Sequence, residues 1–126
     1  MATAAEMVAE AEKQVQNLTV DEAAQELEQG DAVLVDVREP SERAQSGYIA
    51  GAVEAPRGML EFWADPTNPY HREEFDPGRR IILHCASGGR SALAAAALQN
   101  LGYDNVAHMD GGFKGWKEAG RPVEQG

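Results

Sequence analysis

The sequence predicts an α/β domain in which a small parallel sheet is covered by helices on both faces. Short apolar runs rich in Val, Ile and Leu are typical of parallel strands that are buried on both sides. They occur at residues 33–37, 81–84 and 106–109. Helices are expected before, between and after them, at residues 20–29, 92–101 and 113–119. Strands that alternate with helices in this way indicate a parallel sheet with a helix layer on each face.

Capping and turn residues set the ends of the predicted helices. Thr19 and Glu22 form a capping-box pattern that starts the helix at residue 20, and Gly30 should end it. The helix at 92–101 is expected to open after Ser91 and to stop at Gly102. Residues 57–63 suit a further short helix, and the Asp-Pro and Asn-Pro pairs that follow mark a long connecting loop.

Composition and charge place the chain among ordinary globular proteins. Of its 126 residues, 43% are hydrophobic and 25% are charged. We expect one domain at residues 18–126, preceded by a helical extension at residues 1–17 whose apolar residues recur at near-helical spacing. The formal net charge of −10 argues against sequence-independent binding of nucleic acids, which needs a basic surface.

The N-terminal residues lack the pattern of a secretory signal peptide. Glu6, Glu10 and Glu12 interrupt each apolar stretch, whereas a signal peptide needs an apolar run of about seven residues or more. The longest apolar run, Ala92 to Leu98, is too short to cross a bilayer. We therefore expect a cytoplasmic protein that does not bind membranes, in which the single cysteine, Cys85, stays reduced.

The segment with the strongest chemical signal lies between the second predicted strand and the helix that follows it. It has the sequence Cys85-Ala86-Ser87-Gly88-Gly89-Arg90-Ser91 and is called the cysteine loop below. Ligands of open α/β sheets bind at the carboxyl ends of strands. The two glycines allow successive N–H groups to turn inward, and the helix start adds its partial positive charge. A cysteine in such a loop is expected to ionise readily and to act as a nucleophile.

A further observation bears on this interpretation, and it has an alternative. Residues 77–103 contain no Asp or Glu in an otherwise acidic chain, which favours a bound anion there. The alternative is that this stretch is simply buried, and that Cys85 is a small buried apolar residue of the kind most often found after a strand. The coincidence of the glycines, Arg90 and the helix start favours the reactive cysteine.

Five segments together resemble the rhodanese-type sulfurtransferases. They are residues 18–20, 36–39, 46–52, 85–91 and 110–116. The resemblance implies a rhodanese-like fold with an extra N-terminal helix. Two of the five segments depart from the family pattern. Tyr48 and Ala50 replace the usual His and Pro, and Ala86 stands where the thiosulfate:cyanide enzymes carry an Arg, which questions thiosulfate as the natural donor.

The resemblance also implies an activity and its participants. Cys85 would take a sulfane sulfur from a small anionic donor, such as thiosulfate or another persulfide, and pass it to an external thiol or cyanide acceptor. The rest of the cysteine loop, Ala86 to Ser91, would bind the anionic groups, and Arg57 is a candidate for a further substrate contact. No cofactor is implied. His71, His84 and His108 show no metal-ligand spacing with each other or with Cys85.

Two other classes of function stay open. Cysteine phosphatases use a related His-Cys loop that ends in Arg-Ser, but their loop is one residue longer than the six residues from Cys85 to Arg90. A non-catalytic module that binds a partner or senses sulfur is the other alternative. The sequence leaves the oligomeric state open.

Overall fold

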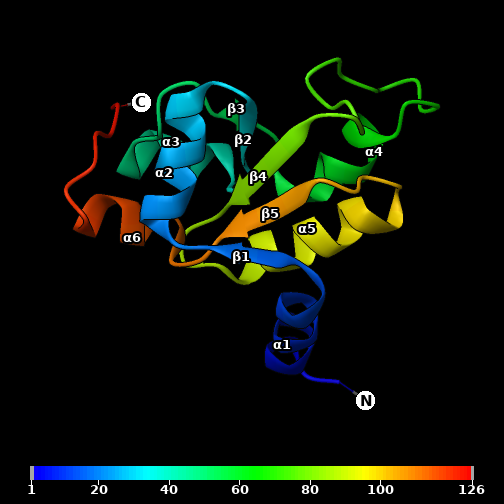
Figure 1. The fold of residues 1–126 in the computed structure, drawn as a ribbon, viewed down its shortest axis with the longest axis horizontal. Helices are drawn as coiled ribbons and strands as arrows, with labels where there is room; N and C mark the ends of the chain where they lie inside the picture. The colour runs from blue at the N-terminus through cyan, green and yellow to red at the C-terminus, as the bar shows by residue number, and fades with distance from the viewer. Residues whose placement is uncertain (1, 126) are drawn as a thin grey trace.

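The computed structural model describes residues 2–125 and confirms the predicted α/β class. The outer ends of the two predicted segments, residues 1 and 126, lie outside the described residues. The strands of the described chain form one five-stranded parallel sheet in the order β1-β5-β4-β2-β3 (Figure 1). They are β1 Gln16–Leu18, β2 Ala32–Asp36, β3 Val53–Glu54, β4 Arg80–His84 and β5 Val106–Met109.

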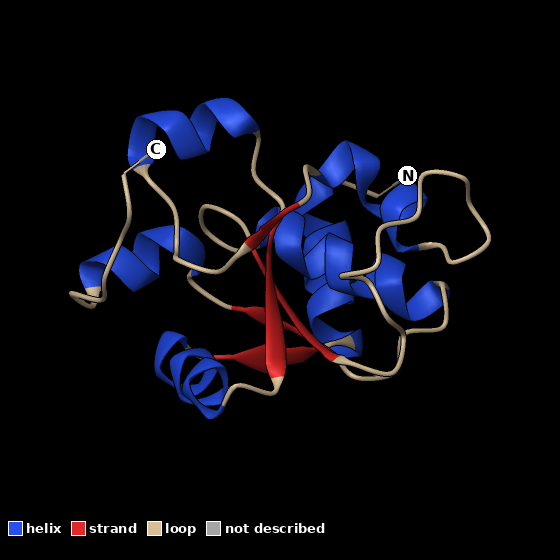
Figure 2. Ribbon diagram, turned by 90° about the horizontal axis from the view of Figure 1, so that it is seen from above, coloured by secondary structure: helices blue, strands red, loops and turns tan. Residues whose placement is uncertain are grey.

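Helices flank the sheet on both sides, as the view along its edge shows (Figure 2). They are α1 Ala4–Gln14, α2 Val20–Gln29, α3 Pro40–Ser46, α4 Leu60–Ala64, α5 Gly89–Asn100 and α6 Gly112–Glu118, with a short 3₁₀ turn at Arg57–Met59. None of the described helices is long and apolar enough to cross a membrane.

The alternation of side chains along β4 divides the core into two layers. Ile81 and Leu83 pack with buried residues of α4 and α5 on one face of the sheet. Ile82 packs with buried residues of α2 and α6 on the other face. This is the arrangement expected for a strand whose successive side chains point to opposite sides. Cys85 belongs to the α4 and α5 layer.

The capping predictions for α2 are confirmed. The Thr19 hydroxyl accepts the Glu22 N–H at 3.1 Å, and the Glu22 carboxylate accepts the Thr19 N–H at 2.9 Å. Gly30 follows the helix with φ +84°, the left-handed conformation that glycine adopts at low cost.

The structure differs from the sequence prediction at one helix start and at the two edge strands of the sheet. The start predicted at residue 92 for the helix after the cysteine loop is wrong, because α5 begins at Gly89 with Gly88 as its N-cap at φ +133°. The predictions also missed both edge strands. In β1, Gln16 and Asn17 are polar and exposed and carry no strand pattern, and β3 is only two residues long, Val53–Glu54.

The N-terminal segment packs on the rest of the domain in the same chain. Helix α1 lies against α5 (Figure 1), with Ala11 buried. At its middle, Val8 approaches the start of α5, where a Cβ built on Gly89 would lie 3.7 Å from Val8 Cγ2. Strand β1 then joins the sheet beside β5. The segment is thereby placed next to the cysteine loop.

Candidate functional site

Cys85 is the residue that follows β4, a central strand of the sheet, and it directly precedes the turn into α5. Its residue surface is 1% exposed. The carboxyl end of a central parallel strand is where ligands of open α/β sheets bind. The fold therefore puts the sole cysteine of the chain at the position that the sequence analysis expected.

The sulfur of Cys85 receives a hydrogen bond from the backbone of its own loop. The Gly88 N–H donates to Sγ over 3.1 Å. The Cys85 thiol lies 3.6 Å from Ser91 Oγ, to which it can donate. Of the loop N–H groups expected to face the sulfur, that of Gly88 is the one that bonds it in the described residues. A backbone donor at this distance favours negative charge on the sulfur.

The start of α6 fixes the back of the cysteine loop. The Phe113 N–H donates to the Cys85 carbonyl at 2.8 Å, and the Lys114 N–H donates to the Ala86 carbonyl at 3.0 Å. Gly112 precedes these donors with φ +58°, and a Cβ built on it would lie 2.6 Å from the Cys85 oxygen. Only glycine lets the two backbones approach this closely. The predicted Gly-rich closing segment therefore has a structural task at the site.

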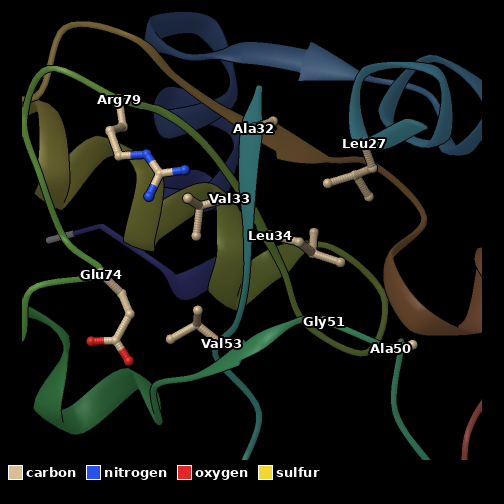
Figure 3. A pocket seen from close by; sticks show the side chains of 9 residues that line it. All are labelled: Leu27, Ala32, Val33, Leu34, Ala50, Gly51, Val53, Glu74 and Arg79. Carbon is tan, nitrogen blue, oxygen red and sulfur yellow. The ribbon is translucent and has the colours of Figure 1, made fainter. Parts of the chain in front are cut away.

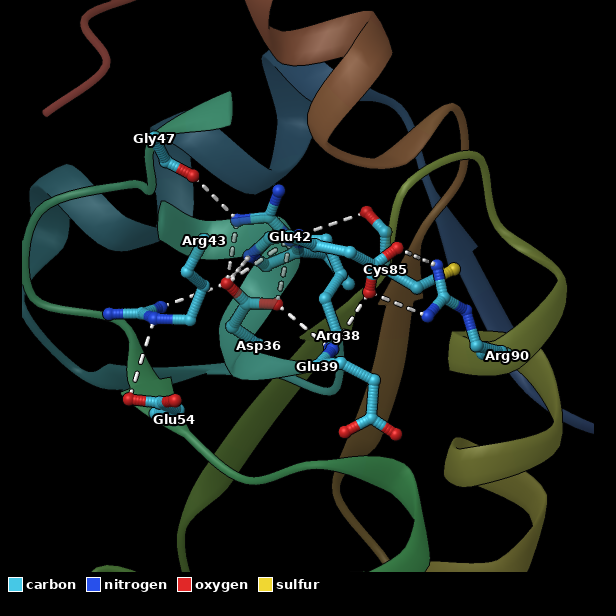
Figure 4. A network of polar contacts seen from close by, with 10 residues as sticks. Asp36, Arg38, Glu39, Glu42, Arg43, Gly47, Glu54, Cys85 and Arg90 are labelled. Carbon is cyan, nitrogen blue, oxygen red and sulfur yellow. Dashed lines mark hydrogen bonds and ion pairs between the residues drawn. The ribbon is translucent and has the colours of Figure 1, made fainter. Parts of the chain in front are cut away.

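Arg90 points from the first turn of α5 toward α3 and forms a two-pronged ion pair with Glu42 (Figure 4). Hydrogen bonds from Arg90 lower the pKa of Glu42, and the same bonds are the main cause of a raised pKa at Arg90. Negative charge on Cys85 raises the pKa of Arg90 further. The predicted anion-binding arginine thus lies near the sulfur, but a carboxylate already balances its charge.

A second ion-pair network lies beneath this one (Figure 4). Asp36 accepts hydrogen bonds from Arg38 and Arg43 at 2.9 Å each, and Arg38 also donates to the Gly47 carbonyl at 2.9 Å. Burial alone would raise the pKa of Asp36, but the hydrogen bonds and positive charges around it hold that pKa below its ordinary value. The network ties β2 to α3 and positions Glu42, one turn along α3, for Arg90.

His84 precedes Cys85 but does not form a dyad with its sulfur. Its Nδ1 lies 3.1 Å from the carbonyl oxygen of Cys85, and its Nε2 lies 3.8 Å from Asp36 Oδ2. Burial lowers the pKa of His84, so the neutral ring donates from Nδ1 to the carbonyl. His84 therefore supports the backbone of the cysteine loop.

Arg57, the predicted further substrate contact, pairs with Glu61 at 2.7 Å. Its backbone N–H donates to the Val37 carbonyl at 3.1 Å. Among the described residues we find no hydrogen bond or ion pair between Arg57 and the cysteine loop.

The sequence analysis did not assign a role to His108, although the structure brings it to the site. Its Nδ1 lies 3.0 Å from Ser91 Oγ, and its Nε2 lies 2.7 Å from Asn17 Oδ1. Glu12 and Asp110 each have a carboxylate oxygen within 4.8 Å of an imidazole nitrogen. Both ring nitrogens of His108 have hydrogen-bond partners in this structure.

A pocket opens next to Ala86. It is lined by Arg38, Glu42, Ser46, Ala86, Phe113, Lys114 and Lys117. Three of these residues are cationic, and Arg38 stacks over the Phe113 ring at 4.1 Å from its centroid. This is the described pocket that adjoins the cysteine loop with a surplus of positive charge.

Another pocket lies at the opposite end of β2, where the strand starts at Ala32 (Figure 3). Glu74 and Arg79 from the long α4–β4 connection line it, together with aliphatic side chains such as Val33 and Val53. Its lining includes none of the predicted site residues. The pocket beside Ala86 is therefore the one considered for substrate.

Comparison with known proteins identifies the family of this chain. A model of the rhodanese-like domain matches residues 19–119. The chain belongs to the rhodanese-like domain family. Within it, the chain is 34% identical over 93 residues to a sulfurtransferase of Allochromatium vinosum, a match that covers 74% of this chain and 78% of that protein. The resemblance inferred from sequence segments is thereby confirmed.

Solved structures with the same fold carry different descriptions. A protein of unknown function from Rhodopseudomonas palustris, described as a possible tyrosine phosphatase, has a TM-score of 0.94 and 40% identity, covering 98% of this chain and 96% of that one. The polysulfide-sulfur transferase homodimer from Wolinella succinogenes has a TM-score of 0.76 and 27% identity, covering 94% and 85%. The first of these rhodanese-fold structures also matches the N-terminal helix, since it covers nearly all of this chain.

Proposed function

We propose that this rhodanese-like protein is a sulfurtransferase that carries a sulfane sulfur on Cys85 as a persulfide. The observation that carries the proposal is the hydrogen bond from the Gly88 N–H to Cys85 Sγ at 3.1 Å. A fixed backbone donor stabilises a thiolate or a terminal persulfide anion more than their neutral forms. Since Cys85 is the only cysteine of the chain, no other residue can hold the sulfur in this way.

The proposed reaction has two half-reactions. In the first, the Cys85 thiolate attacks the outer sulfur of the donor, thiosulfate or another persulfide. A bond forms between Sγ and that sulfur, and the donor's bond to it breaks, so that the electron pair leaves with sulfite or a thiolate. In the second, a thiolate or cyanide attacks the outer sulfur, the bond to Sγ breaks, and Cys85 returns as thiolate. Such covalent catalysis gives ping-pong kinetics.

The pocket beside Ala86 supports an anionic donor. Lys114 and Lys117 line it and supply positive charge where the uncharged Ala86 cannot. Arg90 contributes less than its formal charge, because Glu42 balances it. We propose that the donor's anionic group binds between the cysteine loop and α6. This arrangement suits polysulfides and protein persulfides as well as thiosulfate.

The acceptor is proposed to be external, a small thiol, cyanide or a thiol on another protein. The chain has no second cysteine that could receive the sulfur. A free reactive thiol requires a reducing compartment, which is the reason for the proposed cytoplasmic location. Neither nucleic acid nor membrane is part of the proposed function.

Intact-mass measurement tests the proposal directly. The reduced protein is incubated with thiosulfate, with polysulfide and with a small persulfide, and its mass is recorded before and after cyanide is added. We expect a gain of one sulfur atom that cyanide removes as thiocyanate. Cys85→Ser is the matched control, because it keeps the shape of the side chain and should gain no sulfur. If no donor adds sulfur to the folded wild-type protein, the proposal is wrong and a non-catalytic module is the better interpretation.

A further inference from the structure

A continuous chain of polar contacts leads from the sulfur to the N-terminal segment. The Cys85 thiol lies 3.6 Å from Ser91 Oγ, and Ser91 Oγ lies 3.0 Å from His108 Nδ1. His108 Nε2 in turn lies 2.7 Å from Asn17 Oδ1. Cys85, Ser91 and His108 are all buried, with at most 1% of their surfaces exposed. Contacts of this kind in a buried site are strong and directional.

The orientation of Asn17 fixes the tautomer of His108. Asn17 Nδ2 donates to the backbone carbonyls of Glu12 at 2.8 Å and Val15 at 3.2 Å. Its Oδ1 therefore faces His108, and an amide oxygen can only accept. Nε2 of His108 must carry the ring proton, which leaves a lone pair on Nδ1 toward Ser91.

The Ser91 hydroxyl has one proton, and two groups other than Cys85 lie close enough to accept it. One is the Gly88 carbonyl at 3.2 Å, which already accepts the Ala92 N–H at 3.1 Å. The other is Nδ1 of His108, which lies closer. The hydroxyl proton therefore points to His108, and the Ser91 oxygen is free to accept the thiol proton of Cys85.

From this geometry we propose that Ser91 and His108 take up the thiol proton of Cys85, with Asn17 holding His108 in the accepting tautomer. The thiol proton moves to Ser91 Oγ while the hydroxyl proton moves to His108 Nδ1, so that a thiol and a neutral imidazole become a thiolate and an imidazolium. Ser91 contacts the reacting sulfur directly, and His108 and Asn17 are positioning residues that act through it. The proposal deepens the proposed function, since it concerns how the attacking thiolate is generated.

The charges around His108 suit a proton acceptor. Burial lowers the pKa of His108, and the carboxylates of Asp110 and Glu12 oppose this effect. The other groups against the ring, Asn17 on β1 and Ser91 on α5, are uncharged. The imidazole is thus neutral and ready to accept, while two nearby carboxylates stabilise the imidazolium once it forms.

The N-terminal segment supplies essential parts of this series of polar contacts. Asn17, together with the two carbonyls that orient it, precedes residue 19, where the match to the rhodanese-like domain begins. Glu12 lies on the same segment. In this protein the segment therefore contributes to the site in addition to packing on α5.

The first test is an NMR titration of the imidazole nitrogens from pH 5 to pH 9. It compares the wild type with Cys85→Ala and with Ser91→Ala. His71→Gln serves to assign signals and as a control, because His71 bonds the Phe75 carbonyl outside the site. We expect His108 to keep its imidazolium form to higher pH in the wild type than in either site variant, since only the wild type can share the thiol proton. Equal midpoints for His108 in all three proteins would overturn the proposal.

The second test measures how fast iodoacetamide alkylates Cys85 as a function of pH. At pH 7 we expect Ser91→Ala and His108→Gln to react about a hundredfold more slowly than the wild type, the low end for loss of a general base, whereas His71→Gln reacts normally. Unchanged profiles in both site variants would also reject the relay. Measuring by mass whether Cys85 gains a sulfur atom distinguishes failure of the proton relay from failure of the proposed function. Loading without any effect of these variants defeats the relay alone, and absence of loading in the wild type defeats the proposed function.

Discussion

Glu42 holds both terminal nitrogens of Arg90, with Oε2 2.8 Å from Nη1 and Oε1 2.9 Å from Nη2. The carboxylate thus occupies the planar face with which an arginine usually grips an anion. Arg90 lies in the loop expected to bind the donor, yet its charge is balanced by Glu42 on α3. Donor binding should therefore depend on Glu42 as well as on Arg90.

The variant Glu42→Gln should strengthen the binding of anionic donors. It leaves a neutral hydrogen-bond partner for Arg90 and removes the opposing charge. We expect KM for thiosulfate to fall by about fivefold, which corresponds to about 1 kcal/mol, the Coulomb energy of two unit charges about 4 Å apart in water. Arg90→Ala should raise KM by a similar factor. Glu54→Gln is the control, because it changes the net charge equally at the ion pair with Arg43. An effect of equal size in that control would show that only net charge matters.

The lysines beside Ala86 give a second prediction on donor binding. Lys114→Ala and Lys117→Ala should each raise KM for an anionic donor by about fivefold by the same Coulomb argument, with little change in kcat. The backbone N–H of residue 114, which bonds the Ala86 carbonyl, is kept in the first variant. Arg79→Ala, in the pocket at the start of β2, controls for net charge. Steady-state kinetics at low salt would measure the effect, and unaltered KM values would remove this pocket as the donor site.

Gly112 should be far less tolerant of alanine than Gly120. Both have positive φ, +58° and +77°, so both variants carry a backbone cost of about 1–2 kcal/mol. A Cβ on Gly112 would also lie 2.6 Å from the Cys85 oxygen and 2.7 Å from the Ala86 oxygen, whereas nothing lies within 4 Å of one on Gly120. We expect Gly112→Ala to lose about 1–3 kcal/mol more in urea unfolding than Gly120→Ala, the usual cost of overpacking. Equal losses would contradict the close approach of α6 to the cysteine loop.

Acid should destabilise the fold through buried histidine before the carboxylates are protonated. Burial lowers the pKa of His84 below its ordinary value of 6.5. The unfolded chain therefore binds a proton below pH 6.5 that the folded chain does not, and stability present above pH 6.5 is lost as the pH falls. The slope is about 1.4 kcal/mol per pH unit for one proton. Asp36, whose pKa is lowered, contributes only at more acidic pH.

Urea unfolding at several pH values between 6.5 and 5 would measure this slope. Burial lowers the pKa of His108 too, so the slope is measured in the Cys85→Ala background, where no thiol proton reaches His108 and both buried histidines contribute. His84→Gln should reduce the slope of the unfolding free energy against pH by the contribution of one proton. His71→Gln should keep the slope that the two buried histidines contribute. A stability that stays flat over this range would contradict the assignment of His84 as a neutral buried ring.

Local patterns in the sequence were enough to predict most of the sheet and the cysteine loop. β2, β4 and β5 are each built around a short apolar run, and the loop from Cys85 to Ser91 is contiguous in sequence. The two pairings that complete the site are not local. Arg90 meets Glu42 across 48 positions, and His108 meets Asn17 across 91. No spacing rule connects such pairs, because only the order of the strands and the packing of α3 bring them together.

The size of the cysteine loop predicts that the protein does not hydrolyse aryl phosphates. Six residues run from Cys85 to Arg90, one fewer than the phosphatase loop that the His-Cys and Arg-Ser motifs resemble. The smaller ring can hold one sulfur atom on the cysteine but crowds a tetrahedral phosphate. Residues 77–103 contain no Asp or Glu that could serve as a catalytic acid, but a carboxylate from another segment lies near the loop. A Cβ built on Gly88 would lie 3.5 Å from Asp110 Oδ1, so this carboxylate is close to the loop. What the site lacks is a free guanidinium, because Glu42 occupies Arg90.

We therefore expect no release of p-nitrophenol from p-nitrophenyl phosphate above the level of the Cys85→Ser variant. The measurement distinguishes sulfur transfer from phosphatase activity, the activity suggested for the related structure from Rhodopseudomonas palustris, which is described as a possible tyrosine phosphatase. An insertion of one glycine between Gly89 and Arg90 lengthens the ring to phosphatase size. It should lower sulfur loading of Cys85 and permit weak phosphate binding, since the loop N–H groups can then surround a larger anion. Robust turnover in the native protein that depends on Cys85 would refute the argument from ring size and favour phosphoryl chemistry at this site.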